Sequence, residues 1–265
     1  MAGKSKNIIL QERDIKIILA CYEYRLLTRD QLRLLFGFGT VTGVNARLHK
    51  LCVNGYLERR FLPIAAATSQ GVYTVGPKGA DIISNIIGLN QDEVTRRRRR
   101  NNKIGAFFVK HLIETNDVRI IFSLSPNIEL IRWAYEPEIC LNGGKRLRPD
   151  AFFQALYENK LYSFFLELDR GTESNNRFVA MKVPTYLKMI RDNVQKREFG
   201  VNYFGVLVVV QSTERLNSLR VLISRKIKGV FWFVEKDRLN SNSLIEPIFA
   251  KAGHERRLNI FGGER

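Results

Sequence analysis

Apolar residues recur at helical spacing three times in the first 54 residues. The first repeat predicts a helix over residues 11–27, with an apolar stripe of Ile15, Ile18, Leu19 and Tyr22. Thr28 is a favourable N-cap for a second, shorter helix. A third helix over residues 41–54 is predicted to bury Val44, Leu48, Leu51 and Cys52. Its other face then consists of small and polar side chains.

Two extended segments follow, at residues 55–62 and 70–76, with the polar turn ATSQ between them, and a further helix is predicted over 77–89. This order resembles a winged helix-turn-helix domain over residues 8–88, with the turn as its wing. The resemblance implies DNA binding through the third helix. The predicted DNA-contacting residues of the third helix and the hairpin are Thr42, Asn45, Arg47, His49, Lys50, Arg59 and Arg60. The alternative is a helical bundle with a hairpin that contacts another protein.

The charge balance favours a polyanionic partner. The chain carries 43 Lys and Arg against 26 Asp and Glu, a net charge of +17, and its pI is near 10.0. An anionic membrane surface would suit this charge equally well, but no segment joins a basic face to an exposed apolar one. No apolar run has the length of a membrane span, and the start lacks a signal-peptide core. We therefore expect a soluble, cytoplasmic protein that binds double-stranded DNA.

Five consecutive arginines, Arg96, Arg97, Arg98, Arg99 and Arg100, lie between the two halves of the chain. Residues 91–111 carry seven Lys and Arg against two Asp and Glu. Such a run repels itself unless an anion neutralises it, and arginine suits bidentate phosphate contact. We expect residues 91–103 to form a linker that adds sequence-independent affinity for DNA. The alternative is a solvated helix start.

The periodicity after the linker predicts an α/β domain over residues 104–250. A helix with the core stripe Ile104, Phe107, Phe108 and Leu112 comes first. Three strands then follow, at residues 128–141, 146–156 and 161–170, with the turns NGGK and YENK between them. A helix over 175–197, an apolar strand over 203–212, a helix over 213–228 and a last strand over 229–237 complete the domain. The predicted fold class is α/β, with a hairpin leading into a mixed sheet.

Two acids share one face of the third strand. Alternate residues of a strand point the same way, so Glu167 and Asp169 are neighbours there, and pairing across the YENK turn brings Asp150 beside Glu167. Like charges that lie side by side need a compensating cation. Mg²⁺ prefers carboxylate ligands, so Asp150, Glu167 and Asp169 are the candidate metal ligands. A bound metal would activate water for attack on a phosphate.

This arrangement resembles the PD-(D/E)XK nuclease-like fold, through Pro149-Asp150 and Glu167. The resemblance implies catalytic roles for Asp150 and Glu167, and Asp169, beside them, is a third candidate catalytic residue. Asp169, however, occupies the position of the lysine of that family, so Lys182 or Lys188 of the following helix would have to supply the cation; Arg170 points to the opposite face. In the alternative interpretation, Asp169 pairs with Arg170 or Arg148, and Thr172 or Ser174 caps the next helix.

The chain as a whole is similar to the replication-relaxation family of plasmid and mobile-element proteins, over about residues 8–235. The matching segments are HLIETNDV, RPDAFF and FFLELDRGTES, followed by Lys182 and Tyr186. The resemblance implies a DNA-associated role in replication, relaxation or their regulation, with replication or mobilisation proteins, or a second copy of the chain, as further partners. Two function classes remain open: a DNA-binding protein with an inactive nuclease-like domain, and a metal-dependent endonuclease.

Overall fold

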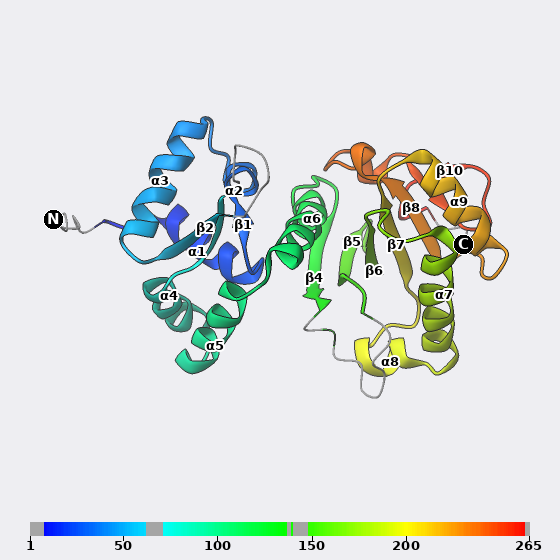
Figure 1. Ribbon diagram of the computed structural model, residues 1–265, viewed down its shortest axis with the longest axis horizontal. Coiled ribbons are helices and arrows are strands. Elements are labelled where there is room, and N and C mark those ends of the chain that lie inside the picture. Colours follow the sequence, from blue (N-terminus) through cyan, green and yellow to red (C-terminus); the bar gives the residue numbers. More distant parts are fainter. Residues whose placement is uncertain (1–7, 62–70, 137–138, 140–147, 263–265) are drawn as a thin grey trace. The chain divides into compact units, whose positions relative to one another are not determined.

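The computed structural model describes residues 8–61, 71–136, 139 and 148–262. The chain forms two compact units, one ending at Asp117 and the other running from Val118 to Arg265. Helices combine with a small antiparallel sheet in the first unit and with a mixed sheet in the second (Figure 1). The predicted α/β class is confirmed. The boundary falls inside a helix, whereas the sequence had suggested a linker at residues 91–103.

The N-terminal unit combines helices with a sheet in the order β1-β3-β2, and both strand pairs are antiparallel. Its elements are α1 (Glu12–Glu23), β1 (Leu27–Thr28), α2 (Arg29–Leu35), α3 (Val41–Val53), β2 (Leu57–Phe61), β3 (Gly71–Val75), α4 (Pro77–Ile87) and α5 (Gln91–Asn102). The first helix is shorter than predicted, because Arg25 adopts a left-handed conformation with φ 69°. The chain then enters β1, which the periodicity had not indicated.

The predicted stripe of α1 is confirmed in part, since Ile18 and Tyr22 are buried. Ile17, Ile18 and Cys21 are fully buried, whereas Ile15 and Leu19 are only half-buried. Thr28 caps α2 as predicted, since its side chain accepts a hydrogen bond from the backbone N–H of Gln31. Gln31, itself buried, donates to the carbonyl of Ile113, so the first part of α6 packs with this unit. The predicted wing turn ATSQ lies outside the described residues.

The second unit is a sheet in the order β10-β9-β8-β7-β6-β5-β4. The strands β6, β7 and β8 are parallel, and the strands on either side of them are antiparallel. The elements, starting with the helix that links the units, are α6 (Ala106–Ser123), β4 (Glu129–Tyr135), β5 (Ala151–Tyr157), β6 (Lys160–Asp169), α7 (Asn175–Arg191), α8 (Val194–Phe199), β7 (Gly205–Val210), α9 (Thr213–Ser224), β8 (Phe231–Glu235), β9 (Phe249–Lys251) and β10 (Arg257–Leu258).

Each face of this sheet carries its own core. Apolar residues of α7 and α9, among them Phe178, Val183 and Leu216, pack with Phe165 on one face. Val118 and Phe122 at the end of α6 pack with Phe153, Phe164 and Leu166 on the other, together with residues that follow β8. All of β7 is buried, as expected of a central parallel strand with both faces covered.

Three predictions for the elements from α6 onwards were wrong. The helix expected over 175–197 is divided into α7 and α8, because Asn193 has a left-handed φ of 50°. The strand at Phe231–Glu235 is not the last, since the short strands β9 and β10 follow it. Of the predicted core stripe of α6, Leu112 is buried as expected, but Phe107 and Phe108 are 68% and 63% exposed, and Val109 is buried in their place. The turn NGGK lies outside the described residues.

Candidate functional site

The hairpin of β5 and β6 places Asp150 beside Glu167, as the sequence predicted. Its two-residue turn consists of Glu158 and Asn159, both with left-handed φ, which is typical of a type I′ turn. Ala151 is therefore paired with Leu166. One residue further, the Asp150 N–H donates to the Leu166 carbonyl at 2.9 Å, and Asp150 Oδ2 accepts from the Leu168 N–H at 2.6 Å.

Glu167 is 2% exposed, and both of its carboxylate oxygens are bound by side chains of α7. Lys182 Nζ lies 2.5 Å from Oε2, and the Tyr186 hydroxyl donates to Oε1 at 2.8 Å. The two donors are four residues apart and thus lie on one face of α7. The predicted proximity of Lys182 to the acids is therefore present in the structure.

The electrostatics of this cluster follow from its burial. Burial raises the pKa of Glu167 to about 7; Lys182 opposes this shift, and Asp150 adds to it. Burial alone would lower the pKa of Lys182, but the Glu167 carboxylate raises it. Burial and the same carboxylate raise the pKa of Tyr186. The tyrosine therefore stays a hydrogen-bond donor at neutral pH.

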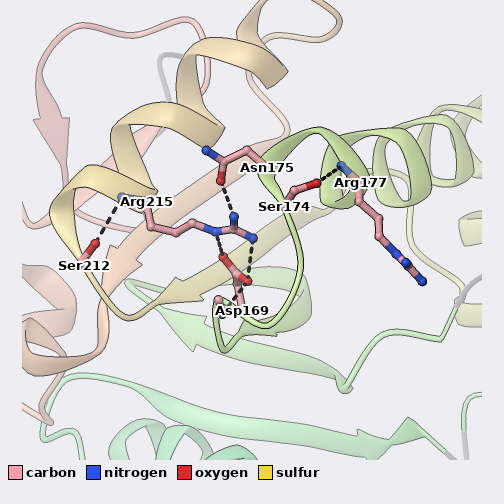
Figure 2. Close-up of polar contacts among 7 residues, drawn as sticks. Asp169, Ser174, Asn175, Arg177, Ser212 and Arg215 are labelled. Atoms are coloured by element: carbon pink, nitrogen blue, oxygen red, sulfur yellow. Dashed lines mark hydrogen bonds and ion pairs between the residues drawn. The ribbon is translucent and has the colours of Figure 1, made fainter.

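Asp169 is 4% exposed and is bound by an arginine from α9 (Figure 2). Arg215 Nε donates to Oδ2 at 2.5 Å, and Arg215 Nη2 donates to Oδ1 at 3.0 Å, which is a bidentate pair. The Gly171 N–H also donates to Oδ1, at 3.1 Å. Arg215 is thus an ion-pair partner of Asp169, whereas Arg148, a partner in the alternative interpretation, lies 3.8 Å from Glu136.

The start of α7 belongs to the same polar network. Arg215 Nη1 donates to Asn175 Oδ1, while Ser174 caps the helix by accepting from the Arg177 N–H at 3.3 Å (Figure 2). The predicted capping role of Ser174 is confirmed. Together, Asp169 and Glu167 fasten α9 and α7 to β6.

Side-chain donors of the protein occupy the carboxylate oxygens of Glu167 and Asp169. Among the residues that the structure describes, no three His, Cys, Asp or Glu side chains are grouped so that they could hold a metal ion. The Glu167 oxygens face an ammonium and a hydroxyl, and those of Asp169 face a guanidinium. The positive charge beside Glu167 and Asp169 comes from Lys182 and Arg215, and the magnesium site of Asp150, Glu167 and Asp169 stays a prediction.

Helix α3 presents the polar face that its sequence pattern predicted. Thr40 caps the helix by accepting from the Gly43 N–H at 3.0 Å. Val44, Leu48 and Leu51 are fully buried, and Cys52 is half-buried. The opposite face is exposed and consists of Thr42, Asn45, Ala46, His49 and Lys50.

Arg47, predicted to contact phosphate, has a structural role instead. Its Nε lies 2.6 Å from Oδ1 of Asp14, a fully buried carboxylate of α1, and its Nη2 donates to the Ile9 carbonyl at 3.2 Å. Burial raises the pKa of Asp14, but the hydrogen bonds from Arg47 and the Gln11 N–H together lower it by more. The net shift of this pKa is therefore downward. The pair joins α3 to the start of α1.

The two arginines of β2 differ in how far their charge is exposed to solvent. Arg59 is exposed, with its guanidinium 4.6 Å from the centre of the Phe61 ring. Arg60 Nη1 donates to the carbonyls of Asn102 and Ile104, at 3.0 and 2.8 Å. It therefore binds the C-terminal end of α5, and only Arg59 presents its charge to solvent.

The five consecutive arginines lie in helix α5. Its N-terminal signals were present in the sequence, because Asn90 is the N-cap and Asp92 and Glu93 occupy the first turn. The Arg97 guanidinium stacks 4.7 Å above the Tyr22 ring, and Arg98 Nη1 lies 2.6 Å from Glu58 Oε1. Arg96, Arg99 and Arg100 are exposed.

The fold and the site define a mixed α/β protein in whose second unit Glu167 and Asp169 are paired with Lys182 and Arg215. The replication-relaxation family model matches residues 20–203, so the chain belongs to this family. Membership suggests a role in the replication or relaxation of mobile elements. No curated protein and no solved structure matches the chain. None of the helices that the structure describes is both long and apolar enough to cross a membrane.

Proposed function

We propose that the chain binds double-stranded DNA of a plasmid or another mobile element and acts as an accessory factor in its replication or relaxation. The observation that carries this proposal is the exposed face of α3, which holds Thr42, Asn45, His49 and Lys50 over a fully buried apolar stripe. Asparagine, threonine and lysine are side chains that read base edges and phosphates in the major groove.

The arrangement around α3 supports a winged helix-turn-helix. The elements run α1, β1, α2, α3, β2, β3, and β1 completes the sheet beside β3. In such a unit the third helix is the recognition helix and the hairpin of β2 and β3 lies beside it. Arg59, exposed on β2, is then available to a neighbouring phosphate.

For the C-terminal unit we propose a nuclease-like fold that serves as a scaffold. Its order of helix, three strands, helix, strand agrees with that fold. The acids, however, bind Lys182, Tyr186 and Arg215, so they stabilise the packing of α7 and α9. The adjacency of Asp150, Glu167 and Lys182 is the one observation that favours a second candidate, cleavage of DNA.

Fluorescence anisotropy with a labelled duplex tests the proposed function. The duplex is chosen by selection from a random library on the wild-type protein. Asn45→Ala combined with Lys50→Ala should weaken binding at least tenfold, because base and phosphate contacts are both lost. Asn176→Ala combined with Lys226→Ala removes the same residue types from exposed positions of the C-terminal unit and serves as the control. Equal affinities of the two double variants would refute the role of α3.

A further inference from the structure

Helix α5 has an inward face that holds the fold together. Val94 and Asn101 are buried there, and Asn101 Oδ1 accepts from Arg25 Nε at 3.2 Å. Arg97 stacks on Tyr22, and Arg98 pairs with Glu58. These residues join α5 to α1, β2 and the segment before β1.

The outward face of α5 is a strip of four cations. The strip consists of Arg96 and the residues three, four and seven positions after it, which are Arg99, Arg100 and Lys103. At this spacing the four side chains share one side of the helix. All four are exposed. In the described part of the chain, no carboxylate lies within ion-pair distance of any of them. We call these four residues the α5 strip.

The helix dipole does not account for this strip. Acidic residues in the first turn and basic residues in the last turn complement the dipole, and α5 has both. The dipole, however, acts mainly within the last turn, and Arg96 lies near the middle of the helix. Cations three or four residues apart on one helix face repel one another. The strip therefore destabilises the isolated protein, and an external anion that neutralises these charges would remove the repulsion.

We infer that the α5 strip binds the phosphate backbone of DNA, independently of sequence and as a second contact beside α3. At a rise of about 1.5 Å per residue, Arg96 to Lys103 spans roughly 10 Å. Phosphates of one strand follow at about 3.4 Å along the duplex axis, so the strip covers about three of them. The inference rests on the proposed function, because that function supplies the DNA. It divides the arginine run into Arg97 and Arg98, which are structural, and three arginines that bind.

The test measures how affinity for a fixed 30-base-pair duplex depends on salt concentration. Log K falls as log salt rises, and each lost phosphate contact makes this negative slope shallower by about 0.9. The outward variant, Arg96→Gln with Arg99→Gln and Arg100→Gln, should reduce the steepness of the slope by about 2 to 3, and its melting temperature should be no lower than that of the wild type, because the removed cations repel one another. The inward variant, Arg97→Gln with Arg98→Gln, should melt at a lower temperature and keep the wild-type slope.

A charge-matched control is Arg225→Gln with Lys226→Gln and Lys228→Gln, which removes three exposed cations from the C-terminal unit. The inference is overturned if the outward variant and this control have equal slopes, or if the inward variant loses as much slope as the outward one. It is also overturned if the outward variant keeps the wild-type slope on DNA but loses binding to phosphatidylserine vesicles. These results leave the role of α3 intact, whereas a wild-type protein that binds no duplex contradicts the proposed function itself.

Discussion

The positive charge that balances Glu167 and Asp169 comes from the chain itself. Lys182 reaches Glu167 from α7, and Arg215 reaches Asp169 from α9. The pairing of Asp150 with Glu167 was predictable, because a two-residue turn fixes the register of a hairpin. Arg215 was not, because it lies 46 residues from Asp169 and no local pattern joins them. Arg47 was misassigned for the same reason, since its partner Asp14 belongs to another helix.

At the residue scale, Arg215→Met should strongly destabilise the protein. The side chains of Arg215 and Asp169 are 15% and 2% exposed, so the variant leaves a buried carboxylate without its cation. Such a loss costs about 3–5 kcal/mol, and an additional Asp169→Asn substitution should restore most of it. Urea unfolding measures both variants. Arg225→Met, at the exposed end of the same helix, is the matched control, and a cost as small as that of the control would contradict the prediction.

Glu167 should make stability depend on pH. Its pKa is about 7 in the folded state against a usual 4.5, so the folded protein binds more protons than the unfolded chain between these values. Its contribution to the free energy of unfolding is therefore complete below pH 4.5 and is lost as the pH rises through 7. Relative to Glu167→Gln, the wild type should lose about 1–3 kcal/mol over this range. Urea unfolding at pH 5 and pH 8 measures the difference, and a constant difference between the two proteins would contradict the prediction.

At the scale of elements, long periodic segments were predicted well and short ones were not. The helices α3 and α4 and the strands β2, β3 and β7 lie where the pattern placed them. The short strands β1, β9 and β10 contain too few residues to show alternation. Phe107 and Phe108 were assigned to the core because they share a helical stripe with Leu112, but the buried face of α6 passes through Val109 and Leu112.

The packing of α4 against the small sheet depends on Gly79. A side-chain methyl at this position would collide with the carbonyl oxygen of Tyr56 and lie 3.2 Å from side-chain atoms of Ile18 and Val75. Gly79→Ala should therefore lower the free energy of unfolding by about 1–3 kcal/mol, although alanine is the better helix former. Chemical denaturation checks this value. Gly39→Ala, where the methyl meets open space, is the control, and a Gly79→Ala protein as stable as this control would show that α4 is not seated as described.

At the scale of the whole molecule, charge and family membership point the same way. The net charge of +17 suits a polyanion, and the chain belongs to the replication-relaxation family. The α/β class was predictable from the change of periodicity along the chain. The ion pairs of Glu167 with Lys182 and of Asp169 with Arg215 were not predictable in this way. A sequence motif shows which acids lie near one another but not which cations they bind. Our central proposal is that the protein binds DNA without cutting it.

Supercoiled plasmid incubated with saturating protein and Mg²⁺ or Mn²⁺ tests this claim most directly, with a gel run before and after the protein is removed. The account predicts that the bound plasmid is fully retarded and that it returns to the supercoiled position once the protein is digested. Asp150→Ala and Glu167→Ala are run in parallel as controls. Nicked or linear plasmid that forms with the wild type and disappears with both variants would contradict the account, because it would show that the carboxylates cleave DNA.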